Sequence, residues 1–306
     1  MTTVELNPIR VAAPAATAAT AKRPLSFAKR ARLRQIRFCS RWIQALSGIP
    51  GVAAFLKTTR DWPLAHTVLS GLTGYNRTFS TLHEAEAFIA EYDGGGHSHP
   101  FCAMNLMETI GKASPSDYPA LFFLQSILPE INTIFDFGGS VGNLFYCYSQ
   151  YLDFPTHLRW LVYDLPKNVE LGEEIASRRG EHRLSFTSSL NDGDGADLLL
   201  ATGAIHYFEE PLSEKLASFH KKPRYVLINR TPLTDGAPFA TVQDAGRYRV
   251  ACLFHNQGDL VHNFEAAGYE LLDTWRAPER SHMIPCYPER SVSAYSGLFF
   301  RLRDGR

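Results

Sequence analysis

The chain has 306 residues, 45% of them hydrophobic, and its 31 Lys and Arg balance its 31 Asp and Glu to a formal net charge of zero. That length suits one large α/β domain, alone or with a helical extension, and the zero net charge argues against a nucleic-acid-binding protein. Five scattered cysteines without a CxxC pair are typical of reduced, intracellular thiols. The sequence has neither an apolar run long enough to span a bilayer nor a signal-peptide core, so we predict a cytoplasmic protein.

The N-terminal part is predicted to be a tail followed by a helical region over 25–130. Residues 1–24 are rich in Ala, Thr and Pro and are expected to be disordered. The segment 22–60 holds ten Lys or Arg and no acid. Within it, apolar residues spaced among arginines predict a basic amphipathic helix over 22–47, which either packs against the main domain or contacts an anionic membrane surface.

Two more helices are predicted in the second half of this region. The stretch STLHEAEAFIAEYDGGG begins with the capping-box pattern Thr81-x-x-Glu84 and ends in a glycine run that stops a helix. The stretch SPSDYPALFFLQSILPE forms the second helix and ends just before the first strand. His97 and His99 lie in the loop between the two helices. We interpret them as ordinary polar loop residues and predict no metal site.

From residue 131 onward, short apolar runs alternate with helical patterns, which is typical of a parallel sheet covered by helices on both faces. We therefore predict an α/β domain over 131–306. Its last strand follows a loop rather than a helix and is expected to run antiparallel to its neighbour. Gln243 and His282 lie in long irregular segments and are given no role. The predicted strands are 132–137, 158–164, 183–188, 196–202 and 224–229, with two more in GYELLDTW and SAYSGLFFRL.

The densest signal is the stretch DFGGSVG at 136–142, between a predicted strand and a predicted helix. Glycine tolerates positive φ and lets a ligand approach the backbone, and the start of a helix offers free N–H groups to an anion. Asp136, two residues before the first glycine, would repel a pyrophosphate and attract an ammonium group. A ligand with both a carboxylate and an ammonium is an amino acid, which indicates the methionyl end of S-adenosylmethionine. A tight turn without a ligand is the alternative.

The next predicted strand, in WLVYDLP, ends in Asp164. An acid at this position accepts hydrogen bonds from ribose hydroxyls in nucleotide-binding α/β folds. Because Pro166 starts the following helix, Asp164 is alternatively the N-cap of that helix. We predict ribose binding because the glycine loop lies upstream.

The pattern DxGGxxG followed by DLP resembles the class I S-adenosylmethionine-dependent methyltransferases, in particular the small-molecule O-methyltransferases. It is also similar to a bacterial methyltransferase group often encoded among cell-surface polysaccharide genes. The resemblance covers about residues 130–306 and implies S-adenosylmethionine as the cofactor. It also implies a doubly wound, Rossmann-like sheet of seven mostly parallel strands with an antiparallel last strand. The implied cofactor residues are Asp136, Gly138, Gly139, Ser140 and Gly142 for the methionyl part, Asp164 and Leu165 for the ribose and adenine, and one of Ser188, Ser189 and Asn191 for the adenine, of which we choose Ser189.

The stretch DLLLATGAIHYF places His206 nine residues after Asp197. In the small-molecule O-methyltransferases that the chain resembles, a histidine at matching spacing is the general base, and imidazole suits that work at neutral pH. Packing or a contact with the cofactor is the alternative for His206. Tyr207 is predicted to line the acceptor pocket, and Arg230 is predicted either to clamp an acidic group of the acceptor or to form an ordinary surface ion pair.

The predicted function is therefore O-methylation of a small molecule or a glycan precursor by in-line methyl transfer. Two other classes stay open. The first is a nicotinamide-dependent reductase, since Tyr163 and Lys167 have the Tyr-x-x-x-Lys spacing of some reductases, although Pro166 between them breaks the helical turn that this spacing needs. The second is a non-catalytic adaptor that retains the fold. The oligomeric state is not predicted.

Overall fold

The computed structural model describes residues 38–39, 42–72, 74–90, 111, 113–244 and 249–303, without the side chains of 70–72 and 244. The tail predicted over 1–24 and most of the basic helix predicted over 22–47 lie outside the described residues, as do His97 and His99. The structure therefore does not test these predictions. The predicted division of the chain into domains also stays a prediction.

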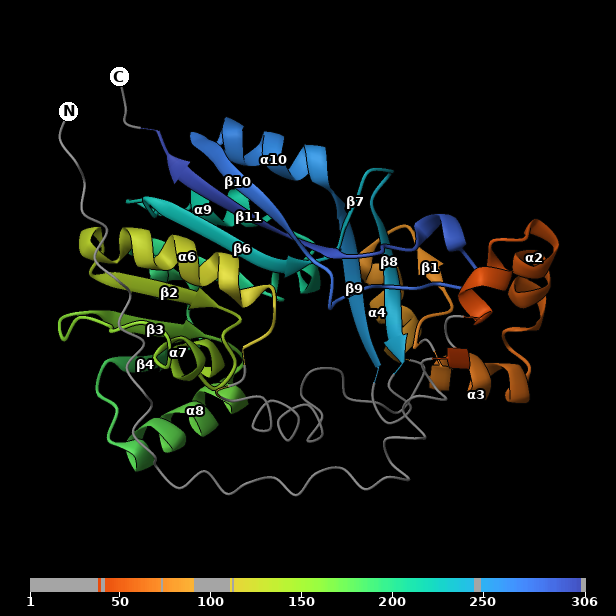
Figure 1. The fold of residues 1–306 in the computed structure, drawn as a ribbon, viewed down its shortest axis with the longest axis horizontal. Helices are drawn as coiled ribbons and strands as arrows, with labels where there is room; N and C mark the ends of the chain where they lie inside the picture. Colours follow the sequence, from red (N-terminus) through yellow and green to blue (C-terminus); the bar gives the residue numbers. More distant parts are fainter. Residues whose placement is uncertain are drawn as a thin grey trace, which may run out of the picture.

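A seven-stranded sheet forms the larger of two sheets (Figure 1). Its strand order is β10-β11-β6-β5-β2-β3-β4. β11 pairs antiparallel with both β10 and β6, and the other pairings in this sheet are parallel. This confirms the predicted doubly wound α/β sheet with an antiparallel last strand. The strands are β2 (Thr133–Phe137), β3 (Arg159–Tyr163), β4 (Leu184–Thr187), β5 (Leu198–Thr202), β6 (Tyr225–Thr231), β10 (Tyr269–Ala277) and β11 (Tyr295–Leu302).

Helices cover both faces of this sheet, so β2, β5 and β6 are buried almost throughout. On one face, Leu124, Phe145 and Ile175 pack in a cluster with Trp160 of β3. On the other face, buried residues of two further helices join the cluster around Phe135 of β2. The helices of the first face are α6 (Asp117–Ile127), α7 (Asn143–Tyr148) and α8 (Pro166–Arg179), and those of the second are α9 (Leu212–Ala217) and α10 (Gln257–Ala266).

A second sheet of four strands was not predicted. Its order is β1-β8-β9-β7, and it joins residues from the predicted helical region to a segment inserted between β6 and α10. Gln243, which we placed in an irregular segment, lies in β8 and pairs with Val250 of β9. The strands are β1 (Thr78–Phe79), β7 (Leu233–Thr234), β8 (Phe239–Asp244) and β9 (Arg249–Asn256).

Helix α4 (Leu82–Ala90) covers one face of the second sheet with Leu82 and Ala85. Its predicted capping box is present in a shifted form. The Glu84 N–H donates to Thr81 Oγ1 at 3.1 Å, and the Glu84 carboxylate accepts from the N–H of Ser80, one residue before Thr81, at 2.9 Å. The cap sets the start of α4 and so helps to place the second sheet.

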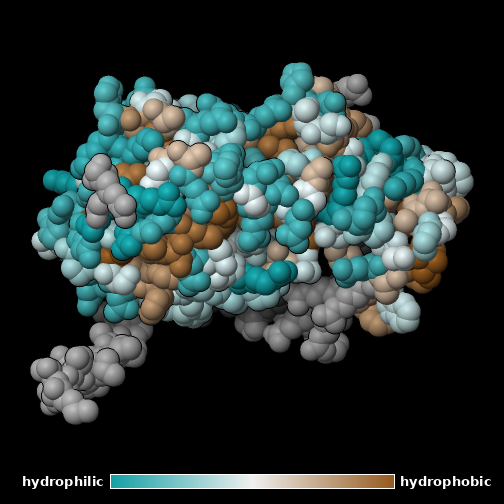
Figure 2. All heavy atoms as spheres, turned by 90° about the horizontal axis from the view of Figure 1, so that it is seen from above, coloured by the Kyte–Doolittle hydropathy of each residue, from teal (hydrophilic) through white to brown (hydrophobic). Residues whose placement is uncertain are grey.

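The carboxyl ends of the parallel strands point toward the second sheet, as the arrowheads of β2 and β6 show in Figure 1. Beyond the second sheet lie α2 (Pro50–Thr59) and α3 (Pro63–Leu72). Apolar side chains of this end, among them Phe55, Trp62 and Leu64, are exposed, and brown atoms mark that end in Figure 2. In the part of the chain that the structure describes, every helix is too short or too polar to traverse a bilayer.

Candidate functional site

The glycine loop leaves the carboxyl end of β2 and turns tightly into α7. The Gly138 N–H donates to the Tyr163 carbonyl at 2.8 Å, and its φ of 71° lies in the left-handed region. A Cβ at Gly138 would collide with Ala204, in the turn that follows β5. Gly142, with φ 81°, is the N-cap of α7, and a Cβ there would press on Leu184. The glycines at these two positions are therefore required by backbone conformation and by close approach.

Ser140 occupies the position between them with a φ of 58°, a conformation that costs a non-glycine residue about 1 kcal/mol. Its backbone N–H donates to Asp164 Oδ2 at 2.7 Å, which ties the loop to the end of β3. The Ser140 hydroxyl is buried and has no hydrogen-bond partner among the described residues. Asp164 thus stabilises a strained loop that holds an unsatisfied polar group.

Asp136 is fully buried beneath this loop. Its Oδ2 accepts a hydrogen bond from Trp160 Nε1 at 3.0 Å, whereas Oδ1 has no partner among the described residues. Burial raises the pKa of this carboxyl to about 7, and the Asp164 charge adds to the rise, while the Trp160 hydrogen bond and the Arg230 charge oppose it. A Cβ at Gly139 would collide with the carboxylate, so only glycine lets the loop close over Asp136.

Asp164 makes two further hydrogen bonds through Oδ1, from the Leu165 N–H at 2.7 Å and from Asn168 Nδ2 at 2.6 Å. The N-cap residue of α8 is Leu165, and no side chain caps that helix, so the alternative interpretation of Asp164 as its N-cap is wrong. A carboxylate has about four lone-pair sites, and three are used here, which leaves acceptor capacity for a hydroxyl.

Leu165 and Ser189 lie at the same edge of the sheet as Asp164. The Leu165 side chain is exposed beyond β3, although it is large and apolar. Ser189 is exposed beyond β4 and begins η3 (Leu190–Gly193), and its N–H donates to Thr187 Oγ1 at 3.0 Å. The predicted cofactor residues are thus gathered at the carboxyl ends of β2, β3 and β4.

His206 lies in η4 (Ile205–Tyr207), a short helical turn after β5. It is 5% exposed, and its ring lies 4.1 Å from the ring of Tyr207 and 6.2 Å from that of Tyr295, measured between centroids. Tyr207 is partly buried against the Phe239 and Phe254 side of the second sheet. The predicted base and the predicted pocket residue therefore lie where the two sheets meet.

Three polar residues of this junction were missed by the sequence analysis. His282, fully buried between β10 and β11, has Nδ1 at 3.1 Å from the hydroxyl of Tyr295, and its ring packs on Tyr75 and Phe254. Tyr75 also forms a side-chain hydrogen bond with Tyr295. The residues come from distant segments, so no local pattern indicates that they meet.

Arg230, the last residue but one of β6, has a φ of 52° and forms an ion pair with Asp117 at 2.9 Å. Asp117 is 1% exposed and also accepts from the Tyr148 hydroxyl at 3.0 Å. The pair is thus buried, not the ordinary surface pair that we considered. Arg230 Nε has no partner among the described residues, and its predicted role toward an acceptor stays a prediction.

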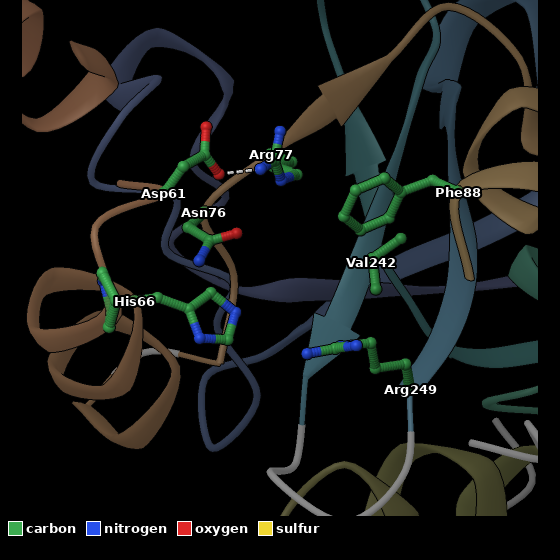
Figure 3. Close-up of a pocket in the computed structure, with 8 residues that line it drawn as sticks. Asp61, His66, Asn76, Arg77, Phe88, Val242 and Arg249 are labelled. Atoms are coloured by element: carbon green, nitrogen blue, oxygen red, sulfur yellow. Dashed lines mark hydrogen bonds and ion pairs between the residues drawn. The ribbon is translucent and has the colours of Figure 1, made fainter. Parts of the chain in front are cut away.

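A separate pocket of about 350 Å³ lies between the N-terminal helices and the second sheet, and none of the predicted site residues lines it (Figure 3). His66 and Arg249 point into it, and Arg77 is paired there with Asp61. Across the described residues, no group of three or more His, Cys, Asp or Glu is placed to hold a metal ion.

No protein-family model and no curated protein matches this chain. Among solved structures, it is similar to the 1,6-didemethyltoxoflavin-N1-methyltransferase of Burkholderia thailandensis, bound to 1,6-didemethyltoxoflavin and S-adenosylhomocysteine (TM-score 0.47, 19% identity, 75% of this chain and 93% of that chain). It is similar to an O-methyltransferase from a trans-AT polyketide synthase of Brevibacillus brevis, in complex with S-adenosylhomocysteine (TM-score 0.46, 10% identity, 61% of this chain and 72% of that chain). It is also similar to the [4+2]-cyclase SpnF (TM-score 0.43, 13% identity, 74% of this chain and 94% of that chain). Since a fold does not determine an activity, the function is argued from the site.

Proposed function

We propose that this protein is an S-adenosylmethionine-dependent methyltransferase that methylates an oxygen of a small molecule or a glycan precursor. The observation that carries the proposal is the glycine loop closing over the buried Asp136 carboxylate, which keeps one oxygen without a partner. Nearby, at the ends of β2 and β5, the Ser140 and Thr202 hydroxyls are likewise buried and unpartnered among the described residues. Such unsatisfied groups fit a polar ligand with donors and acceptors, as the methionyl end of the cofactor has.

The residues that would hold the cofactor fall into two groups along the sheet edge. The loop with Gly138, Gly139, Ser140 and Gly142 would surround the methionyl part above Asp136. Asp164 would accept hydrogen bonds from the ribose, and Leu165 and Ser189 would contact the adenine, since both side chains are exposed at that edge. When bound, the cofactor supplies a methyl group already activated by a positive sulfur.

The chain's own part is alignment and proton removal. Alignment of donor and acceptor can supply roughly 7–11 kcal/mol of the barrier in ideal cases. A hydroxyl acceptor also loses a proton, and His206, at the end of β5 next to the loop residue Ala204, is the proposed base. Tyr207 and Arg230 are proposed to contact the acceptor.

The reductase alternative is weakened by where the Tyr-x-x-x-Lys residues lie. Tyr163 is the last residue of β3, and Lys167 lies in the first turn of α8, behind Pro166. A tyrosine and a lysine four apart face each other only on one helix. The buried acid at Asp136 also disfavours a pyrophosphate in the loop, because the two would carry like charges.

Titration calorimetry with S-adenosylmethionine, S-adenosylhomocysteine and NADPH tests the proposal. We expect the first two to bind and NADPH not to bind. Binding of NADPH alone would support a reductase, and binding of none of the three would support an adaptor.

Asp164→Asn is expected to weaken S-adenosylmethionine binding roughly ten- to a hundredfold, because a charge-assisted hydrogen bond to the ribose is worth about 1.5–3 kcal/mol. Asparagine is preferred to alanine here because its oxygen can still accept from the Ser140 N–H that fastens the loop. The measurement is the dissociation constant by calorimetry, with the melting temperature recorded in parallel.

Asp194→Asn is the matched control. Asp194 also accepts backbone N–H bonds, from His220 and Lys221 at 3.0 and 2.9 Å, but it lies before β5, at the opposite edge of the sheet. Its substitution should leave cofactor affinity unchanged. Equal affinities of the wild type and Asp164→Asn would remove the ribose assignment.

We also propose that the protein is cytoplasmic and contacts an anionic membrane surface through residues 22–47. Trp42 and Leu46, four residues apart at the described end of this segment, are both exposed and lie on the same side of a helix. Deleting 22–47 should abolish sedimentation with acidic liposomes at low salt and leave cofactor affinity intact. A lowered melting temperature without any liposome binding by the full chain would instead show that the segment packs on the protein.

A further inference from the structure

His282 has no part in the chemistry proposed above. Its side chain is fully buried, and its backbone is held by a two-way bridge with Val292, at 2.8 and 2.7 Å. Its Nε2 has no hydrogen-bond partner among the described residues. Native proteins rarely leave a buried polar nitrogen unsatisfied, so this atom indicates a missing partner.

The hydrogen bonds on the other side of the ring agree with a proton on Nε2. Tyr75 and Tyr295 share a side-chain hydrogen bond, which acts to lower the Tyr295 pKa against the larger effect of burial. With Tyr75 as the donor of that bond, the Tyr295 hydroxyl hydrogen can point at His282 Nδ1, 3.1 Å away. A neutral imidazole carries one N–H, and this arrangement leaves it on Nε2.

His282 stays in the neutral form, because burial holds its pKa well below the usual value and the nearby His206 lowers it further. The other titratable groups that act on Tyr75 and Tyr295 are Cys252, Tyr207 and Arg280. In the tautomer with the proton on Nε2, this buried nitrogen is a donor that lacks an acceptor oxygen within the described part of the chain.

The surroundings of His282 describe what kind of molecule would supply that oxygen. The rings of His206 and His282 lie 6.2 and 6.4 Å from the ring of Tyr295. Aromatic rings of Tyr75, Tyr207 and Phe254 belong to the same surroundings. Aromatic neighbours suit an uncharged ring, and two neighbouring imidazoles suit two neighbouring oxygens.

We propose that His282 is an acceptor-binding residue that donates from Nε2 to an oxygen adjacent to the reacting hydroxyl of a ring compound, with Tyr295 and Tyr75 fixing its tautomer. The proposal rests on the proposed function. It narrows the acceptor to rings that carry two neighbouring oxygens, whether aromatic or sugar-like. His206 takes the proton of one oxygen, and His282 holds the other.

The test uses full-length protein loaded with S-adenosylhomocysteine and two matched pairs of probes. Catechol and phenol form the aromatic pair, and trans-1,2-cyclohexanediol and cyclohexanol form the aliphatic pair. In at least one pair the two-oxygen probe should bind roughly two- to tenfold more tightly than its one-oxygen partner, which is the worth of one net hydrogen bond. The pair that shows the preference tells whether the acceptor ring is aromatic or sugar-like.

Two substitutions of His282 distinguish the role of its Nε2 donor from that of the rest of the side chain. His282→Gln places an amide nitrogen near the position of Nε2 and should keep the preference. His282→Asn places its amide near Nδ1, within reach of Tyr295, and should abolish the preference without changing S-adenosylhomocysteine affinity. Nitrogen NMR of the wild-type imidazoles should show His282 protonated at Nε2, and Tyr295→Phe should allow the other tautomer to appear.

Three results would overturn the inference. They are equal binding within both probe pairs by the wild type, a preference that survives in His282→Asn, and an Nε2 without a proton. Failure of the proposed function is distinguishable, because it appears as absent binding of S-adenosylhomocysteine before any probe is added. The NMR result needs no acceptor, so it decides on the tautomer even if the substitutions impair folding.

Discussion

His206→Gln is expected to lower turnover by roughly 10²–10⁴ while cofactor affinity and melting temperature stay near those of the wild type. His206 is 5% exposed at the end of β5, so glutamine can fill the space and keep polar atoms there, but it cannot take a proton. Activity of the wild type should rise with pH as the imidazole loses its proton, because only the neutral form accepts one. His282 should not contribute a second step, since its pKa lies well below the usual range.

The control for this prediction is His220→Gln. His220 is exposed and bonded to Asp194 at the opposite edge of the sheet, so its substitution should leave turnover and the pH profile unchanged. Near-normal turnover of His206→Gln would rule out the base role and leave alignment as the source of catalysis. A loss of stability or of cofactor affinity in that variant would point to packing or to a cofactor contact instead.

The larger sheet was predictable because its signals are local. Each of its central strands is a short run of apolar and β-branched residues between helical patterns, as in TIFDF and YVLINRT. Gly268, with a φ of 100°, separates α10 from β10, and a glycine is the usual residue at such a helix end. In the larger sheet, the secondary structure that the local sequence favours is the one that the tertiary structure contains.

The second sheet depends on pairings that no local pattern carries. Thr78 of β1 pairs with Thr241 of β8, more than a hundred and fifty residues later, and β1 is only two residues long. The strands β8 and β9 are apolar enough to be strands, but nothing in the sequence says that they leave the main sheet. The same separation hid the cluster of Tyr75, His282 and Tyr295.

The surroundings of Asp136 were also only half predictable. The sequence places an acid at the end of a strand, where a ligand could reach it, but successive side chains of a strand point to opposite faces. Asp136 therefore shares the face of Ile134, beneath α7, and meets the Trp160 indole there. The pairing of β2 with β3 decides that contact, and the buried carboxyl has a pKa of about 7.

Asp136→Asn is expected to stabilise the cofactor-free protein at pH 8 and to weaken its binding of S-adenosylmethionine. The carboxyl pKa rises from 3.8 in the unfolded chain to about 7 in the folded one, so the stability that its neutral form contributes is present below pH 4 and is lost as the pH rises to about 7. Three pKa units correspond to an upper limit of about 4 kcal/mol. Asparagine never ionises and its oxygen can keep the Trp160 hydrogen bond, so the variant should escape this loss.

The measurement is the free energy of unfolding by urea at several pH values between 4 and 8, with and without cofactor. The two proteins should be similar near pH 4 and diverge as the pH rises. Added S-adenosylmethionine should narrow the gap, because its ammonium group favours the ionised wild-type carboxylate. Asp194→Asn should behave in the opposite way, since backbone N–H bonds lower the Asp194 pKa to about 2, and that substitution should destabilise the protein above pH 4. A stability difference for Asp136→Asn that does not change with pH would mean that Asp136 keeps the same charge in the folded and the unfolded chain. Its place under the glycine loop would then be structural, and the assignment of the cofactor's ammonium to this carboxylate would fail.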